Sequence, residues 1–124
     1  MVSARNNEAK RIENKDIACM IDDGEEVLCV DPSLPLLSLL GKKYTMMILG
    51  VIGNRGTRGS FNEIINGIPH SSSTIISRRL KELKEFGLIY KNVGSNAITY
   101  SLSDFGSKIR ETMMPLFRIM DQKG

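Results

Sequence analysis

The stretch SSTIISRRLKELKEFGLIY, residues 72–90, reads as one helix followed directly by a strand. Its first half carries hydroxyl side chains and two adjacent arginines, whereas its second half alternates lysine with glutamate. On a helical wheel of about 100° per residue, one broad face is apolar, so we expect it to be buried. The residues of this face are Ile75, Ile76, Leu80, Leu83 and Phe86.

The opposite face of the same helix is polar and consists of Thr74, Ser77, Arg78, Lys81 and Glu85, with Lys84 at its margin. Short hydroxyl side chains near the helix start permit close approach to a base edge, and Arg78 reaches further. The free amides at a helix start also favour an anion. The pattern is typical of a recognition helix in a DNA major groove. For Lys81, Glu82, Lys84 and Glu85, a solvated face with ion pairs one turn apart explains the pattern equally well.

The residues before this helix predict a helix-turn-helix. SFNE, residues 60–63, is a capping box, so a short helix is expected over residues 61–66. Gly67-Ile-Pro-His70 then breaks the chain, and Ser71 or Ser72 can cap the next helix. A very apolar segment, residues 44–52, precedes them as a buried helix. Helices joined by a short Gly/Pro turn are the layout of DNA-binding helix-turn-helix proteins.

A hairpin is expected directly after the recognition helix. Residues 88–92 and 97–102 are rich in β-branched and aromatic side chains and flank Val93-Gly-Ser-Asn96. In this position the hairpin is a wing. Lys91, Asn92, Ser95 and Asn96 are expected near its tip, where they could lie along a minor groove or a phosphate strand.

The two ends of this domain are predicted to be helical. Asp31-Pro32 suits a helix start, followed by leucines at helical spacing up to Gly41. Residues 103–121 begin with a serine cap and carry an apolar stripe, with a kink expected at Pro115. We expect the stripe to form a dimer interface, although intramolecular core packing is the alternative. The interface residues would be Ile109, Met113, Leu116, Phe117 and Met120.

The N-terminal residues 1–30 are expected to form an acidic arm. Two apolar runs, residues 17–21 and 27–30, flank Asp22-Asp-Gly-Glu-Glu26 and predict a β-hairpin. Residues 1–31 hold four Lys or Arg and eight Asp or Glu, a charge of −4, whereas residues 32–124 hold thirteen and six, a charge of +7. The basic remainder favours a polyanionic partner.

Several functional classes find no support in the sequence. No apolar run is long enough to span a bilayer, and no secretory h-region occurs near the start, so a cytoplasmic protein is the default expectation. Cys19 and Cys29 form no CxxC motif, and no cluster has metal-ligand spacing. His70, the one histidine, has no nucleophile partner and suits a turn. We therefore expect no enzyme activity, metal or cofactor.

From about residue 31 to residue 120 the chain resembles the HxlR-type winged-helix transcription regulators of bacteria and archaea. The segments that carry the resemblance, in family order, are LGKKYTMMIL (40–49), SFNEI (60–64), ISRRLKEL (76–83), FGLI (86–89) and TYSLSDFG (99–106). The resemblance implies a dimer. Arg79 coincides with a recurrent family arginine, and its place beside the buried face favours an ion pair or a phosphate contact. Tyr44 stands where the family usually has Trp, and Ser71 replaces an apolar residue. Asp31 takes the place of a cysteine that is a redox switch in some members, and Cys29 lies two residues earlier.

Together these observations predict an α+β, mostly α fold: a winged helix-turn-helix over residues 31–124 with a two- to three-stranded wing sheet, an N-terminal hairpin arm over residues 1–30 and a C-terminal dimerisation helix over residues 103–121. The expected function is sequence-specific binding of double-stranded DNA by a homodimeric transcriptional regulator. The alternatives are a winged-helix protein-interaction module and a thiol- or ligand-responsive switch in the arm, with an unidentified small-molecule effector. The expected DNA-binding residues are Ser72, Ser73, Thr74, Ser77, Arg78, Arg79, Lys81, Lys84, Lys91, Asn92, Ser95 and Asn96.

Overall fold

The structure, a computed structural model, describes residues 18–123, so residues 1–17 of the expected arm lie outside it. The chain divides into two compact units, Met1–Ser38 and Leu39–Gly124. In the first unit, strands β1 (Cys19–Asp22) and β2 (Val27–Val30) form an antiparallel hairpin. Its loop is closed by Asp23, whose carboxylate accepts hydrogen bonds from the amides of Glu26 and Glu25 at 2.8 and 2.9 Å. These bonds hold the pKa of Asp23 below its ordinary value. The predicted hairpin is confirmed.

The register of this hairpin separates its two thiols. Cys19 pairs with Val30, whereas Cys29 pairs with Met20. Because neighbouring residues of a strand point to opposite faces, Cys19 and Cys29 lie on opposite faces of the hairpin. Both cysteines are free, and this register keeps them from forming a disulfide with each other within one chain.

The first helix, α3 (Pro35–Leu40), begins later than the sequence suggested. The Asp31 carboxylate accepts hydrogen bonds from the hydroxyl and the amide of Ser33 at 2.7 and 2.9 Å, which lower its pKa, and the amide of Leu34 donates to the Asp31 carbonyl at 3.1 Å. Asp31 and Pro32 therefore form a turn, because an aspartate that caps its own following amides stabilises a turn as well as a helix start. Pro35 takes the first helical position, where its missing N–H costs nothing.

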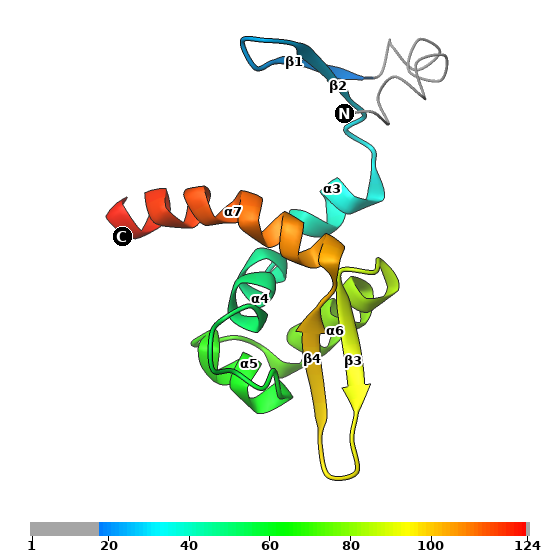
Figure 1. Cartoon of the computed structure of the whole chain (residues 1–124), viewed down its shortest axis with the longest axis vertical. Helices are drawn as coiled ribbons and strands as arrows, with labels where there is room; N and C mark the ends of the chain where they lie inside the picture. Colours follow the sequence, from blue (N-terminus) through cyan, green and yellow to red (C-terminus); the bar gives the residue numbers. More distant parts are fainter. Residues whose placement is uncertain (1–17, 124) are drawn as a thin grey trace. The chain divides into compact units, whose positions relative to one another are not determined.

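Three helices of the second unit form the group from which the wing projects (Figure 1): α4 (Thr45–Ile52), α5 (Phe61–Gly67) and α6 (Ser73–Glu85). Their core residues, with those of the neighbouring elements, are Leu39, Ile48, Leu49, Ile52, Ile64, Ile68, Ile76, Leu80, Leu83, Leu88, Ile89 and Met113. The wheel is therefore confirmed for Ile76, Leu80 and Leu83, whereas Ile75 is half-buried and Phe86 is 40% exposed. Phe86 caps the end of α6, and Gly87 at φ +78° turns the chain away, so helical periodicity no longer holds there.

Side-chain caps start the two helices of the helix-turn-helix. The Ser60 hydroxyl accepts from the Glu63 amide at 3.2 Å, and the Glu63 carboxylate accepts from the Ser60 amide at 3.1 Å, which lowers the pKa of Glu63. The Ser72 hydroxyl accepts from the amide of Ile75 at 3.3 Å. Between these helices His70 adopts a positive φ of 63°, as a tight turn requires. The predicted capping box and turn are confirmed.

The wing consists of β3 (Ile89–Val93) and β4 (Ile98–Leu102), paired antiparallel with Lys91 opposite Tyr100. A single bridge between Ser60 and Thr99 replaces a third strand. Beside it the amide of Tyr100 donates to the Gly59 carbonyl at 2.8 Å. Gly59 has φ +73°, and a Cβ there would collide with the Tyr100 carbonyl oxygen. Glycine thus lets the loop before α5 lie directly against the wing.

The last helix, α7 (Asp104–Lys123), is fixed at its start to the end of α6. The Ser103 hydroxyl accepts from the amide of Gly106 at 3.0 Å and donates to the Gly87 carbonyl at 2.5 Å. The Ser103 amide donates to the Leu88 carbonyl at 3.0 Å, and a Cβ on Gly106 would collide with that same carbonyl. The helix then continues through Pro115 without interruption.

One side of the apolar stripe of α7 packs against the core of the chain, and the other side is exposed. Met113 is only 6% exposed and belongs to the core, and the half-buried ring of Phe117 lies against Gly50 of α4. These two residues therefore pack within the chain, as the alternative interpretation of the stripe expected. The outward side holds Phe105, Leu116, Ile119 and Met120, which are between 41% and 56% exposed. Ile109 is half-buried at its margin.

Candidate nucleic-acid interface

The exposed face of α6 and the wing enclose a groove of about 580 Å³, which we call the cationic groove. Its lining residues are Thr74, Ser77, Arg78, Leu80, Lys81, Lys84, Lys91 and Tyr100. Six of them are residues that the sequence marked for DNA binding: Thr74, Ser77, Arg78, Lys81, Lys84 and Lys91. The structure brings these six together although Lys91 belongs to a different element.

Helical and strand periodicity explain how these side chains meet. The α6 residues recur at intervals of three or four, which places them on one face of the helix. On β3, Lys91 lies two residues after the buried Ile89, so both side chains point to the same face of the wing. That face is the one directed toward α6. Lys91 therefore closes the groove from the wing side.

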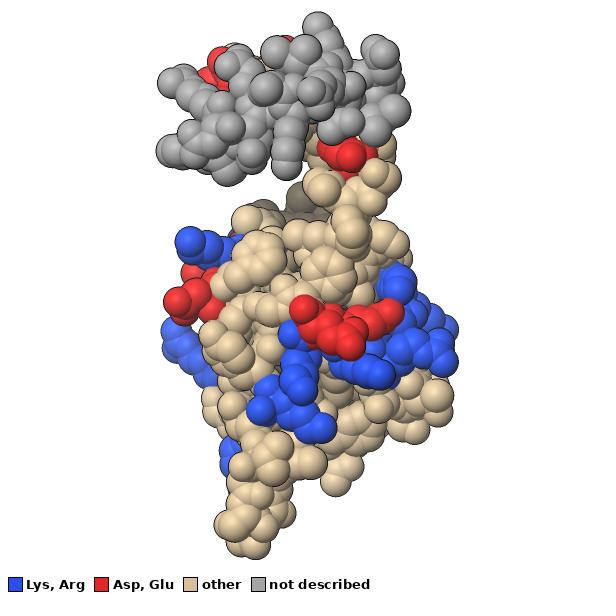
Figure 2. Space-filling view, turned by 90° about the vertical axis from the view of Figure 1, so that its right-hand side faces the viewer, with Lys and Arg blue, Asp and Glu red and all other residues tan. Residues whose placement is uncertain are grey.

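The positive charge of the cationic groove is not compensated locally. No Asp or Glu is among its lining residues. Within residues 18–123, the ion pairs join Lys42 and Arg79 to Glu82, and neither uses a cation of the groove. Figure 2 shows several patches of Lys and Arg across the face turned to the viewer, with smaller acidic patches among them. A low-dielectric groove with one sign of charge concentrates anions.

The comparisons with known proteins agree with this geometry. The profile of the HxlR-like helix-turn-helix family matches residues 39–123. The chain belongs to the HxlR family. It is a transcriptional regulator of the helix-turn-helix class, as the sequence predicted.

Individual relatives give the same assignment. The uncharacterized HTH-type transcriptional regulator YdzF of Bacillus subtilis (strain 168) is 34% identical over 88 residues, which cover 66% of this chain and 80% of YdzF. A crystal structure described as a possible HxlR family transcriptional factor from Thermoplasma volcanium GSS1 superimposes with a TM-score of 0.80 at 44% identity, covering 84% of this chain and 94% of that one. Diamide-treated YodB from B. subtilis has a TM-score of 0.56 at 27% identity, covering 68% and 85%.

Tyr100 is a groove residue of this HxlR protein that sequence reasoning missed. It lies opposite Lys91 in the wing register and lines the same groove. Burial raises the pKa of its hydroxyl, so the phenol stays protonated and can donate a hydrogen bond to an anion. The signal was present, because a four-residue loop over 94–97 fixes the pairing of positions 91 and 100.

Five predicted residues take other places in this HxlR domain. Ser72 caps α6, and Ser73 is exposed beside the groove without lining it. Asn92 lies on the opposite face of the wing from Lys91, where its amide donates to the Ser101 hydroxyl at 3.1 Å. Strand alternation therefore separates Asn92 from the cationic groove. Two further residues, Ser95 and Asn96, line a second groove.

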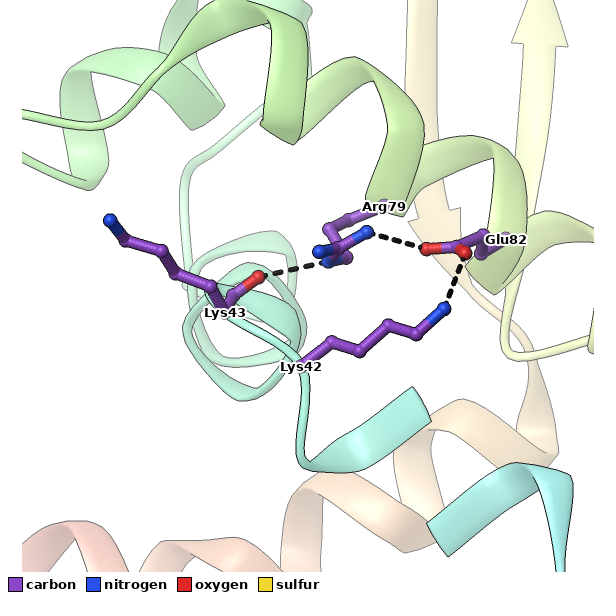
Figure 3. A network of polar contacts seen from close by, with 4 residues as sticks. All are labelled: Lys42, Lys43, Arg79 and Glu82. Carbon is purple, nitrogen blue, oxygen red and sulfur yellow. Dashed lines mark hydrogen bonds and ion pairs between the residues drawn. The ribbon is translucent and has the colours of Figure 1, made fainter. Parts of the chain in front are cut away.

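Arg79 has a structural role, and it does not line the cationic groove. Its guanidinium donates to the Glu82 carboxylate at 2.9 Å and to the Lys43 carbonyl at 3.0 Å, and its side chain is only 11% exposed. Lys42 completes the network with a 2.8 Å ion pair to Glu82 (Figure 3). Of the two roles the sequence allowed, the structure shows the ion pair. This network fixes the turn before α4 against α6.

We expect Glu82 to make the stability of the domain depend on acid pH. The hydrogen bond from Lys42, followed by that from Arg79, holds the pKa of Glu82 below its ordinary value near 4.5. A lowered folded-state pKa stabilises the fold above the unfolded-state value, and this contribution is lost as pH falls through the folded-state pKa. Glu82→Gln should therefore lower the free energy of unfolding by about 1 kcal/mol at neutral pH, and by progressively less below about pH 4.5. Urea unfolding followed by circular dichroism measures both values.

Glu85→Gln is the matched control for this experiment. Glu85 is an exposed residue of the same helix and takes part in no ion pair within residues 18–123. Its replacement should change stability by less than about 0.5 kcal/mol at any pH. Equal effects of the two variants would contradict a specific role for the network.

Neither a metal centre nor a membrane-spanning segment is found in the part of the chain that the structure describes. No three His, Cys, Asp or Glu side chains in residues 18–123 are grouped so that they could hold a metal ion. None of the described helices has the length and hydropathy required to cross a bilayer.

Proposed function

We propose that this HxlR protein is a homodimeric regulator that binds double-stranded DNA sequence-specifically, with α6 in the major groove and the wing beside it. The observation that carries the proposal is the cationic groove. It gathers Arg78, Lys81, Lys84 and Lys91 around the hydroxyls of Thr74 and Ser77, with no carboxylate in its lining. Such a surface fits a polyanion whose edges also offer hydrogen-bond acceptors and donors.

The position and length of the groove side chains suit some of them to base contacts and others to phosphate contacts. Arg78 projects from the exposed face of α6 near its first turn, and a guanidinium can bond the O6 and N7 of guanine with two parallel hydrogen bonds. The shorter Thr74 and Ser77 lie one turn or less before it and suit direct contact with a base edge. Lys84 and Lys91 lie farther along α6 and on the wing, where contacts to phosphates set position rather than sequence preference.

The outward face of α7 supports a dimer. Phe105, Leu116, Ile119 and Met120 leave large apolar side chains exposed on the outward face of α7. Neighbouring apolar side chains exposed in this way, such as Leu116, Ile119 and Met120, favour an interaction site. A second copy would cover it through a twofold axis, because an isologous interface pairs the same surface of each subunit. Helix-turn-helix dimers use this symmetry to reach two half-sites one helical turn apart.

Arg78→Ala should relax sequence preference. We expect about 1–3 kcal/mol of discrimination to be lost at one base pair of each half-site, because a bidentate arginine–guanine contact contributes that much. Fragments recovered from a random duplex pool by the wild-type protein supply the sequence, and fluorescence anisotropy on single-base variants measures the preference. Arg118→Ala is the control, since Arg118 is exposed on α7 and does not line the groove.

The same experiment separates this function from a protein-interaction module. If the wild-type protein enriches no sequence from the pool, or if both arginine variants bind the recovered duplex as wild type does, the proposed function is wrong. Enrichment by the wild type that Arg78→Ala broadens and Arg118→Ala preserves supports it.

A further inference from the structure

A pocket of about 200 Å³ lies between α4 and α7 (Figure 1), and we call it the α4–α7 pocket. It shares no lining residue with the cationic groove. Most of its wall is carbon, from Met47 and Val51 of α4 and from Met114 and Phe117 of α7. Met47 is 41% exposed, so the pocket is open to solvent. Because a cavity of about 150 Å³ holds a benzene ring, this one has room for a single ring with a short polar substituent.

The pocket depends on glycines in α4 at the places where α7 comes closest. A Cβ on Gly50 would lie 3.2 Å from the Phe117 ring, and a Cβ on Gly53 would collide with the Arg110 side chain. Positions three apart lie on one face of a helix, so this face of α4 is bare backbone. The Phe117 ring and the Arg110 side chain therefore lie directly on α4, and both line the pocket.

The guanidinium of Arg110 is the charged group that borders this carbon surface. Its Nε donates to the Gly50 carbonyl at 3.1 Å, and its Nη2 donates to the side-chain oxygen of Asn54 at 3.3 Å. Both acceptors are neutral, and three of the five N–H donors remain. Within residues 18–123 no carboxylate forms an ion pair with Arg110. The negative end of the α4 dipole supplies only about half a charge, so the half-buried cation favours an anion as its partner.

The α4–α7 pocket and the outward apolar side of α7 lie on different flanks of that helix. At about 100° per residue, Arg110, Met114 and Phe117 fall within about 60° of one another. Leu116 and Ile119 lie at least about 100° from all three. A second copy that packed on Leu116 and Ile119 would therefore leave the pocket open, and a small molecule could enter it in the proposed dimer.

We propose that the α4–α7 pocket binds a small organic carboxylate with one apolar ring. The ring packs on Met114 and Phe117, and the carboxylate accepts hydrogen bonds from the remaining N–H groups of Arg110. A planar guanidinium matches the two oxygens of a carboxylate, and such charge-assisted bonds are stronger than neutral ones. Flexible methionine side chains adapt to the outline of the ring. This site is separate from the cationic groove, so the inference goes beyond the proposed function.

Benzoate is the ligand for the test, and methionine methyl groups report where it binds. In the full-length protein, benzoate should shift the methyl NMR resonances of Met47 and Met114 with a dissociation constant on the order of 1 mM. The methyl groups of Met20 in β1 and of Met120 on the outward side of α7 should not respond. Benzamide, which has the same shape without the charge, should bind at least about tenfold more weakly. Acetate, which lacks the ring, should also bind more weakly than benzoate.

Two variants test the charge and the cavity separately. Arg110→Gln keeps an N–H donor for the Gly50 carbonyl but carries no charge, so it should weaken benzoate binding at least about tenfold and abolish the preference over benzamide. Met47→Trp should fill the pocket and weaken binding of both compounds. Arg118→Gln is the matched control, because Arg118 is exposed on the same helix and does not line the pocket. This variant should bind benzoate as the wild type does.

The proposal is overturned if about 10 mM benzoate, ten times the expected dissociation constant, shifts neither the Met47 nor the Met114 resonance. Benzamide or acetate that binds as tightly as benzoate also overturns it, as does benzoate binding that Arg110→Gln leaves unchanged. Circular dichroism shows whether each variant is folded. Should Arg110→Gln fail to fold, Met47→Trp and the comparison of benzoate with benzamide on the wild type still decide. Duplex binding at the cationic groove is measured independently of every one of these results.

Discussion

Raising the salt concentration from roughly 50 to 200 mM should weaken duplex binding by the dimer about 10³- to 10⁵-fold. Each protomer brings Arg78, Lys81, Lys84 and Lys91 to one groove, so two copies can neutralise on the order of 6–8 phosphates. The released counterions then favour dissociation as salt rises. Anisotropy titrations over a salt series should give a log–log slope of about −5 to −7.

Single lysine variants sharpen this prediction. Lys84→Ala and Lys91→Ala should each flatten the slope by about 1.8, since each removes one phosphate contact from both protomers. Arg79→Ala should reduce stability without a comparable change of slope, because its charge is already paired with Glu82. Binding that is indifferent to salt would be incompatible with a cationic groove on the phosphates.

Replacing Leu116 and Ile119 together by glutamate should split the dimer and lower affinity for a two-half-site operator roughly 10²- to 10⁴-fold. Both side chains lie on the outward face of α7, where charges would be buried without partners in the interface. Each freed winged domain should remain folded and bind a single half-site weakly. Sedimentation measures the mass, and anisotropy on one and two half-sites measures the loss of avidity.

Two controls define the α7 experiment. Arg118→Glu places a negative charge on the same helix away from the apolar stripe and should leave the dimer intact. Met113→Glu is unsuitable for splitting the dimer, because Met113 is buried in the core and its charge would unfold the domain. A wild-type protein that sediments as a monomer at micromolar concentration, or a double variant that stays dimeric, would contradict an α7 interface.

The sequence predicted well what short-range chemistry determines. The Ser60–Glu63 capping box and the Ser72 cap each depend on residues within one turn, so their motifs sufficed. The same holds for the Asp-Gly hairpin and for the polar face of α6. The helix start predicted at Asp31-Pro32 was wrong for a reason that is also local, because the same residues stabilise either a turn or a helix start.

Features that depend on long-range packing could not be read in the same way. A helical wheel shows that Met113 and Leu116 share a stripe, but only the position of α4 decides that Met113 is buried and Leu116 exposed. The Arg79 guanidinium donates hydrogen bonds to the Glu82 carboxylate and to the carbonyl of Lys43, and Lys43 lies 36 positions away in the sequence. Tyr100 was missed because its role appears only when the wing register is combined with the place of α6.

The residues Gly87, Leu88, Ser103 and Gly106 form a rigid junction, so a change in the tilt of α7 is passed on to α6. The junction joins the end of α6 to the start of α7 through the bonds of Ser103 to the Gly87 and Leu88 carbonyls and through the close approach of Gly106 to the Leu88 carbonyl, which leaves no room for a Cβ on Gly106. A helix of the 20 residues of α7 is about 30 Å long, so tilting it by about 10° displaces one end by roughly 5 Å relative to the other. Successive base pairs are only about 3.4 Å apart. In the proposed dimer, a change of about 10° in the crossing angle of the two α7 helices would therefore move the two α6 helices relative to each other by more than one base-pair step. The preferred spacing between the operator half-sites should thus depend strongly on this crossing angle.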